Sequence, residues 1–303
     1  MGFVIINTMI RKILTILLSA VILCGCQEEA ELSEYPESPS ITRDEVLYCH
    51  FADEAEWVDA GAAYLDFSPA DSGYVGARVK DGESSDIKLR VTHGEETYTY
   101  DLCDRDINAI PLQMGSGIYT FKVFQQVEGS NYAMIYSEDV DADPDDELSV
   151  YLYPNQVVDY DENSLVVEKS FEQVEGDTDD LTRAYHLYVY VLQLLSYDNE
   201  KAAEVADIYV LPDLDEAITT GKGICFDYAA LLAALCRIQK IPARVIVGYT
   251  DIEYHAWVEL YFENEGWINP KIAFAAEDWV LVDPTFADSG KDYEGLYDEV
   301  YHY

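Results

Sequence analysis

The chain has 303 residues and carries 18 Lys or Arg against 59 Asp or Glu, which gives a formal net charge of −41 at pH 7. A negative field of this strength repels nucleic acids and anionic lipid head groups, so it excludes a nucleic-acid-binding function. The charge would attract cationic substrates such as lysine-rich proteins, but a soluble surface is the simpler explanation of it. The length suits about two domains on the usual scale of roughly 100–200 residues each.

The first 25 residues have the pattern of a leader rather than of a folded segment. Arg11 and Lys12 precede an apolar run, Ile13–Leu23, which is short for a membrane span. The letters LCGC, which end at Cys26, resemble a lipoprotein signal-peptidase site. This resemblance implies a signal peptide at 1–25, cleavage before Cys26 and lipidation of its thiol. The protein would then be extracytoplasmic and lipid-anchored to the bacterial cell membrane. An uncleaved N-terminal anchor is the alternative, and it too places the body outside the cytoplasm.

Residues 26–44 are predicted to form a flexible acidic tether. The segment is rich in glutamate and serine and contains Pro36 and Pro39. Such a composition suits a linker between a lipid anchor and a folded body, because it cannot bury enough apolar surface to fold.

Residues 45–160 are predicted to form a small all-β domain of sandwich type. Alternating runs of β-forming residues indicate strands, and short polar or glycine-containing turns separate them. About 110 residues suffice to bury a core of this kind. The segment has no ordered set of catalytic residue types, so we interpret it as a spacer or binding module. The expected strands are Ile87–Val91, Thr97–Leu102, Ile107–Leu112, Gly117–Phe124 and Tyr132–Tyr136.

An acidic segment in this region, Asp139–Asp143, has the first three acidic positions of a calcium-binding loop. Such a loop continues with glycine and has glutamate at its twelfth position. The chain has Pro144 and Val150 at these two places. We therefore expect an acidic loop here without bound calcium.

A helical pattern begins at Asp179. Apolar residues recur at helical spacing over Leu181–Leu195 and predict an amphipathic helix. His186 lies off the apolar stripe, so we expect it in solvent. Shorter helical turns are expected at Ala202–Ile208 and Asp213–Ile218.

The stretch Gly221–Thr250 predicts a glycine loop, a buried helix and a strand. Every residue over Tyr228–Cys236 is apolar or aromatic, as in a helix buried on all sides. Arg237–Lys240 supplies cations suited to the C-terminus of this helix, and Pro242 prevents its continuation. Ala243–Tyr249 has a β-branched centre and predicts the strand.

Cys225 would lie at or near the first turn of this helix. Partial positive charge at a helix N-terminus favours the thiolate over the thiol, which suits a nucleophile. Cys236 is eleven residues further on, about 16 Å along the axis. A disulfide needs Cα atoms within about 7 Å, so the two cannot pair and Cys236 is expected to fill the core. Cys49 and Cys103 could pair with each other, but nothing in the sequence requires it.

Two later segments carry the residue types that a cysteine nucleophile needs. Tyr254–Phe262 alternates like a strand and has His255 near its start, and Asp278–Thr285 predicts a second strand that is closed by Asp283. The order of helices, nucleophile helix and antiparallel sheet indicates an α+β arrangement.

A Cys, a His and an Asp on three successive elements resemble the transglutaminase-like superfamily. The motifs are GICFDYA around Cys225, YHAWV around His255 and WVLVDPT around Asp283. The resemblance covers residues 165–290 and implies a papain- or transglutaminase-like core. It implies thiol acyl transfer on a protein, peptide or cell-wall amide, as hydrolysis or cross-linking, without a cofactor or metal.

In that chemistry Cys225 attacks the amide carbon and His255 protonates the leaving amine. Asp283 orients the imidazole, and the backbone N–H of Cys225 is one oxyanion donor. The alternative function is a non-catalytic surface binding or adhesion protein with the same cleft. A zinc site of the same three residues is a third option, but no close pair of metal-ligand residues supports it.

Residues around this set have simpler roles. Asp227 is expected to favour the helix N-terminus by its charge. Tyr254 and Trp257 could wall the site against water or merely pack, and the sequence leaves both open. The tail, residues 291–303, is acidic and rich in tyrosine, and it either adds an edge strand or stays loose.

Overall fold

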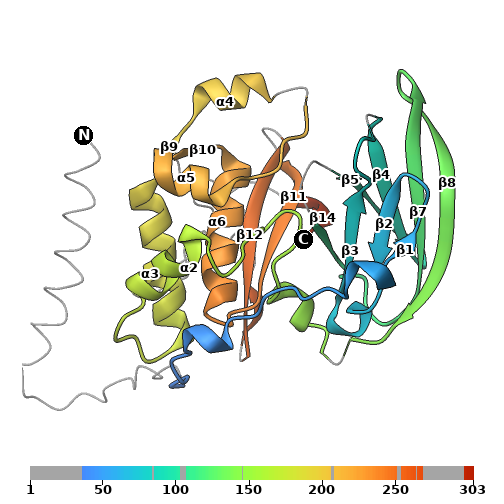
Figure 1. Ribbon diagram of the computed structural model, residues 1–303. Coiled ribbons are helices and arrows are strands. Elements are labelled where there is room, and N and C mark those ends of the chain that lie inside the picture. Colours follow the sequence, from blue (N-terminus) through green and yellow to red (C-terminus); the bar gives the residue numbers. More distant parts are fainter. Residues whose placement is uncertain are drawn as a thin grey trace, which may run out of the picture.

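The computed structural model describes residues 36–83, 85–102, 107–144, 146–205, 208–250, 254–263, 265–268 and 297–303. The predicted signal peptide, Cys26, Cys103 and Asp283 lie outside these ranges. The described part joins antiparallel β-sheets to a layer of helices that packs on another antiparallel sheet (Figure 1). This is the predicted α+β class, with its β-rich region first.

Two four-stranded antiparallel sheets make up the N-terminal region, with strand orders β1-β2-β3-β6 and β5-β4-β7-β8. Phe67, which follows β2, packs on Phe121 of β7 with ring centroids 5.0 Å apart, so side chains connect the two sheets. The strands are β1 (Val58–Asp59), β2 (Ala63–Asp66), β3 (Tyr74–Val79), β4 (Ile87–His93), β5 (Glu96–Leu102), β6 (Asn108–Pro111), β7 (Gly117–Glu128) and β8 (Asn131–Ala142).

The prediction of an acidic loop at Asp139–Asp143 is wrong. Asp139 to Ala142 continue β8, where Asp139 pairs with Thr120 of β7 and accepts a hydrogen bond from its hydroxyl at 2.7 Å. Long-range pairing with β7 overrides the low strand propensity of aspartate, because these carboxylates remain on an exposed edge strand in water.

In the described part of the chain, five α-helices follow, and acidic residues cap several of them. Asp179, Asp198 and Asp213 each accept hydrogen bonds from backbone N–H groups of the first turn, which satisfies donors that have no partner within the helix. The helices are α2 (Leu165–Gln173), α3 (Asp180–Leu194), α4 (Asn199–Glu204), α5 (Leu214–Thr220) and α6 (Cys225–Ile238).

The last sheet has the order β13-β12-β11-β14 and lies against α6 (Figure 1). Its edge strand β14 shows that the described end of the tail, 297–303, adds a strand rather than staying loose. Tyr303 continues this pairing through two backbone hydrogen bonds with Val245. The strands are β11 (Ala243–Thr250), β12 (Tyr254–Phe262), β13 (Gly266–Ile268) and β14 (Tyr297–His302).

Helix α6 is the centre of the structure, as its all-apolar sequence predicted. Every residue from Asp227 to Ile238 is buried, between α2, α3 and α5 on one side and the sheet on the other. Its apolar residues belong to one contiguous cluster that also includes side chains of the N-terminal sheets. The two regions therefore share a hydrophobic core.

Arg237 has a role that the sequence did not suggest. It is fully buried instead of covering the C-terminus of α6 in solvent. Its guanidinium donates to the backbone carbonyls of Tyr153, Ala243 and Tyr303 at 2.7–2.8 Å. One buried cation thus connects the end of the β region, the start of β11 and the last residue of the chain.

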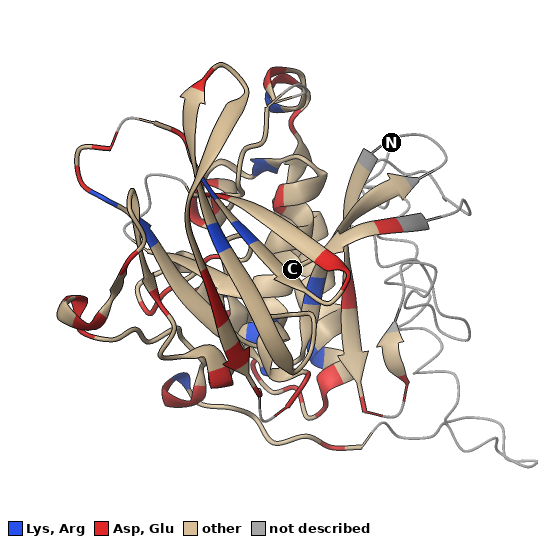
Figure 2. Cartoon of the chain, turned by 90° about the vertical axis from the view of Figure 1, so that its right-hand side faces the viewer, with Lys and Arg blue, Asp and Glu red and all other residues tan. Residues whose placement is uncertain are grey.

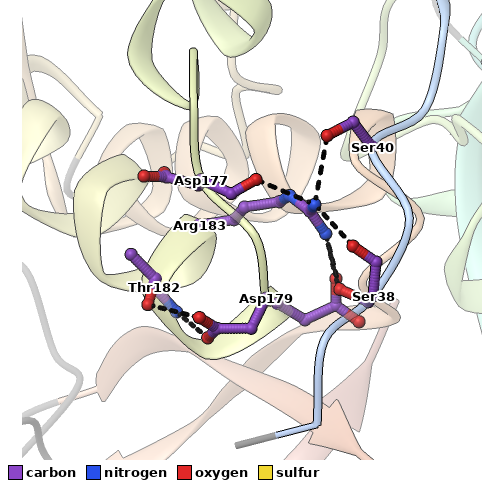
Figure 3. Close-up of polar contacts among 7 residues, drawn as sticks. Ser38, Ser40, Asp177, Asp179, Thr182 and Arg183 are labelled. Atoms are coloured by element: carbon purple, nitrogen blue, oxygen red, sulfur yellow. Dashed lines mark hydrogen bonds and ion pairs between the residues drawn. The ribbon is translucent and has the colours of Figure 1, made fainter.

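The described end of the predicted tether, 36–44, is attached to the helical layer (Figure 3). Arg183 of α3 donates to the hydroxyl and the carbonyl of Ser38, at 2.6 and 2.9 Å, and to the carboxylate of Asp180. The side chain of Arg183 is buried and also reaches the carbonyl of Asp177. At its described end, the predicted tether is therefore hydrogen-bonded to the helical layer.

Acidic residues occur on turns, helices and strands of the chain as coloured in Figure 2, where basic residues are fewer. Within the described ranges, no helix combines the length and apolarity needed to cross a membrane.

Candidate active site

Cys225 is the first residue of α6, which is where the sequence placed it. Its side chain is partly exposed, so a substrate could reach the thiol. The N–H groups of the first turn have no acceptor within the helix, and the helix dipole adds partial positive charge at this point. Both features favour negative charge at this point, such as that of a developing oxyanion.

The other described cysteines are poor nucleophiles. Cys236 is fully buried in α6, and burial raises the pKa of its thiol far above the ordinary value. The pKa of Cys49 is raised in the same way, and its thiol donates a hydrogen bond to the carbonyl of Pro154 at 3.3 Å. Cys49 is a free thiol, and Cys103, with which the sequence left a disulfide open, lies outside the described residues.

The start of α6 is held by a short parallel bridge. Strand β10 (Lys222–Gly223) pairs with β9 (Ser196–Tyr197), which follows α3. The backbone N–H of Asp198 adds a hydrogen bond to the carbonyl of Gly223 at 2.9 Å. The glycine loop before Cys225 is therefore fixed by elements that are distant in sequence.

Asp227 reinforces this geometry from within the helix. Its carboxylate is buried and accepts a hydrogen bond from the backbone N–H of Ile224 at 2.8 Å. The ammonium group of Lys201 on α4 lies 2.8 Å from the same carboxylate. The charge lies at the helix N-terminus as predicted, whereas the hydrogen bond and the ion pair were not revealed by the sequence; the ion pair compensates the negative charge near Cys225.

His255 lies on β12, where it pairs with Gly248 of β11 and is buried. Helix α6 ends at Ile238, the chain turns back within four residues, and β11 runs antiparallel to β12. The start of β12 is therefore at the same end of the layers as the start of α6 (Figure 1). The topology brings the backbone positions of Cys225 and His255 to one end of the domain.

Side chains alternate between the two faces of β12. Ala256, Val258 and Leu260 belong to the core that includes α6, so His255 and Trp257 belong to the opposite set. Trp257 is buried, which favours packing over an exposed wall for this residue.

An apolar surface that the sequence analysis missed lies beside the nucleophile. Ile208, Tyr209 and Val210 connect α4 to α5 and are 61%, 52% and 41% exposed. The ring of Tyr209 lies 6.1 Å from that of Phe226, the residue after Cys225. The signal in the sequence was the apolar run Ile208–Leu211, whose first residue the analysis assigned to a helical turn, whereas α4 ends at Glu204.

No group of three or more Cys, His, Asp or Glu side chains with metal-site geometry occurs in the part of the chain that the structure describes. His186 is half-exposed, as predicted, and its Nδ1 lies 2.8 Å from the Asp177 carboxylate.

One family model and several known proteins match parts of this chain. A family model described as the Transglutaminase-like superfamily matches residues 168–271, a range that includes Cys225 and His255 and ends before Asp283. The uncharacterized protein YebA of Bacillus subtilis (strain 168) is 33% identical over 67 residues. That alignment covers 16% of this chain and only 9% of YebA.

Among solved structures, a candidate cysteine protease from Cytophaga hutchinsonii is 14% identical with a TM-score of 0.36, and the alignment covers 76% of this chain and 91% of that one. Red sea bream transglutaminase is 13% identical with a TM-score of 0.29, over 70% of this chain and 48% of its own. A candidate protease from Parabacteroides distasonis is 12% identical with a TM-score of 0.29, and the alignment covers 68% of this chain and 40% of that one. From the family match, this chain contains a transglutaminase-like domain, placed at residues 168–271.

Proposed function

We propose that this chain is a cysteine-dependent enzyme that transfers the acyl group of an amide through Cys225. The thiolate attacks the carbonyl carbon, the C–N bond breaks, and His255 gives its proton to the leaving amine. Water or a second amine then attacks the thioester and passes a proton to His255, and the thiolate is regenerated. Asp283 orients the imidazole and stabilises its positive charge.

The observation that carries this proposal is the position of Cys225. It is partly exposed at the start of a buried central helix, whereas Cys49 and Cys236 have raised pKa values through burial. His255 starts its strand at the same end of the layers. Because His255 belongs to the face of β12 opposite the α6 core, the imidazole must reach the thiol around the end of the strand.

We further propose that the acyl donor is a protein, peptide or cell-wall amide outside the cytoplasm. One support is the sequence LCGC, which ends at Cys26 and resembles a lipoprotein signal-peptidase site. The other is the strong excess of acidic over basic residues, which disfavours nucleic acid as a substrate. The described chain is attached at Ser38, so a lipid on Cys26 would leave about twelve residues, at most roughly 40 Å, between membrane and body.

The test is alkylation by iodoacetamide at about pH 6, where a thiol of ordinary pKa near 8.5 is almost wholly protonated. Peptide mapping by mass spectrometry should find Cys225 modified, with Cys49 and Cys236 as buried internal controls. His255→Gln should slow the labelling at least about tenfold. At a pH below the thiol pKa, the fraction of thiolate falls tenfold for each unit by which the pKa rises. At pH 9 the wild type and the variant should react at similar rates.

Trapping of a thioester from a library of peptides and wall fragments would then identify the acyl donor. Asp283→Asn should leave the fold intact and reduce turnover severely. Cys225→Ala combined with His255→Gln should be little worse than Cys225→Ala alone, because the residues act as a unit. Rapid labelling at pH 6 without any acyl-enzyme would instead favour the non-catalytic binding protein. Failure of Cys225 to label at pH 6 would refute the thiolate.

A further inference from the structure

Helix α4 is fixed against the loop that precedes Cys225 by the backbone and the side chain of one aspartate. The N–H of Asp198 donates to the Gly223 carbonyl at 2.9 Å, which connects the segment after β9 to this loop. The Asp198 carboxylate accepts hydrogen bonds from two N–H groups at the start of α4, one of which is that of Lys201 at 3.0 Å. The position of Lys201 is therefore set relative to the nucleophile loop.

Lys201 also contacts the nucleophile helix itself. Its Nζ lies 2.9 Å from Oδ1 and 2.8 Å from Oδ2 of Asp227, so the ammonium group reaches both oxygens of the carboxylate. The side chain of Asp227 is 2% exposed, whereas that of Lys201 is 27% exposed. A carboxylate that is almost removed from water is thus compensated by a cation from a different helix.

This carboxylate lies close to the nucleophile. Asp227 Oδ2 accepts a hydrogen bond from the Ile224 N–H at 2.8 Å, and Ile224 directly precedes Cys225. Backbone bond lengths then place this oxygen within about 8 Å of the Cα of Cys225. A unit charge at such a distance has a large effect where water is mostly excluded.

The start of α6 would otherwise favour negative charge. Its first hydrogen bond runs from the Tyr228 N–H to the Ile224 carbonyl, so the N–H groups of the three residues from Cys225 to Asp227 have no acceptor within the helix. They give this end its partial positive charge, which an uncompensated carboxylate would cancel. Asp227 therefore has two opposing effects: its hydrogen bond orders the loop, and its charge disfavours an anion at Cys225.

We propose that Lys201 is a positioning residue for the acyl transfer proposed at Cys225. It neutralises the charge of Asp227 and leaves the hydrogen bond to Ile224 in place, so the helix end remains favourable for the thiolate and for an oxyanion. This assignment rests on the proposed function, because Lys201 acts on the nucleophile through Asp227. Loss of the ammonium group places a net negative charge beside the sulfur.

The experiment compares alkylation of Cys225 in the full chain by iodoacetate, which is an anion, and by iodoacetamide, which is neutral. In both reactions the thiolate attacks the methylene carbon and iodide leaves, so the ratio of the two rates does not depend on the fraction of thiolate. Mass spectrometry of the Cys225 peptide gives both rates at about pH 8.5, where lysine is still charged. Lys201→Met should lower the ratio of the iodoacetate rate to the iodoacetamide rate about three- to tenfold, the effect of one partly screened charge at roughly 8–10 Å.

Paired variants distinguish the charge from a merely structural role. Asp227→Asn keeps an acceptor for the Ile224 N–H but leaves Lys201 without its counter-ion, so the ratio should rise. The double variant Lys201→Met/Asp227→Asn is neutral again, and its ratio should return to within about twofold of wild type. Lys201→Arg retains the charge and should retain the wild-type ratio. A loss of structure would move all four variants in the same direction.

Lys222→Met is the matched control. It removes the same charge from an exposed position three residues before Cys225, where water and salt screen it. The ratio should change less than about twofold in this variant. Equal falls for Lys201→Met and Lys222→Met would leave only the overall charge of the protein and would overturn the proposal.

An unchanged ratio in a Lys201→Met protein with the circular dichroism of wild type would also overturn it. If that variant does not fold, Asp227→Asn decides, because a ratio that falls or stays constant contradicts the assigned charge effect. Failure of wild-type Cys225 to label at about pH 6 would instead refute the proposed function. The ratio is measured at higher pH, where an ordinary thiol also reacts, so the two failures are distinguishable.

Discussion

Gly223 and Asp227 are in direct contact at the start of the nucleophile helix: a Cβ added at Gly223 would lie 2.7 Å from the Cβ of Asp227. The Asp227 carboxylate in turn accepts a hydrogen bond from the Ile224 N–H and forms an ion pair with the Lys201 ammonium. Only glycine leaves room for this carboxylate, so the geometry around Cys225 depends on the absence of a side chain two residues earlier.

Gly223→Ala should therefore displace Asp227 and destabilise the fold by about 1–3 kcal/mol, the usual cost of overpacking. Urea denaturation measures this free energy of unfolding. Lys222→Ala, at the exposed neighbouring position, is the matched control and should lie within about 0.5 kcal/mol of wild type. An unchanged midpoint for Gly223→Ala would mean that the helix start is not held by Asp227.

The burial of α6 gives a second prediction. Leu231→Ala and Leu232→Ala each remove a fully buried side chain and should cost about 2–5 kcal/mol in the free energy of unfolding. Leu165→Ala makes the same change at a position that is 38% exposed, at the start of α2, and should cost much less. Similar losses at all three positions would contradict a central, buried α6.

Buried tyrosines predict loss of stability in alkali. Burial raises the pKa values of Tyr74 and Tyr151 to about 12. Below the ordinary tyrosine pKa of about 10, these phenols are protonated in both states and their contribution is fully present. Between about pH 10 and 12 the unfolded chain loses protons that the folded chain keeps, so stability falls as the pH rises.

Phenolate absorbance near 295 nm, recorded together with urea midpoints from pH 9 to 12, follows this loss. Tyr151→Phe should reduce the slope of stability against pH in that interval. If all 25 tyrosines ionised near pH 10 with the fold intact, the burial of these rings would be refuted.

The apolar surface beside Cys225 predicts a preference among substrates. Ile208→Ser should slow alkylation of Cys225 by peptidyl chloromethyl ketones with an apolar side chain, and it should leave the rate with iodoacetamide unchanged. The reason is that exposed apolar area next to the nucleophile gains by covering an apolar group. Ile118→Ser, at a residue of nearly equal exposure on β7, is the control. If the chloromethyl ketone alkylated Ile208→Ser and Ile118→Ser at the same rate, Ile208 would not belong to the substrate-binding surface.

The proposed lipid anchor is tested at one residue. Cys26→Ser should prevent lipid labelling, and the chain should be released from membranes or remain unprocessed. Incorporation of labelled fatty acid into the Cys26→Ser protein at the wild-type level would rule out the lipoprotein proposal.

The sequence by itself determined the elements whose pattern is local. An unbroken apolar run identified α6 as a central helix, and the glycine loop before it placed Cys225 at its start. Alternation along β12 identified the strand that carries His255. These predictions succeeded because helix termini and the periodicity of side chains depend on neighbours in the chain.

The tertiary structure decided the rest, because the partners concerned are far apart in sequence. Asp139 lies in a strand only because Thr120 pairs with it, and Arg237 is buried only because three distant carbonyls meet there. Lys201 finds Asp227 through the bridge of β9 with β10, which no local pattern reveals.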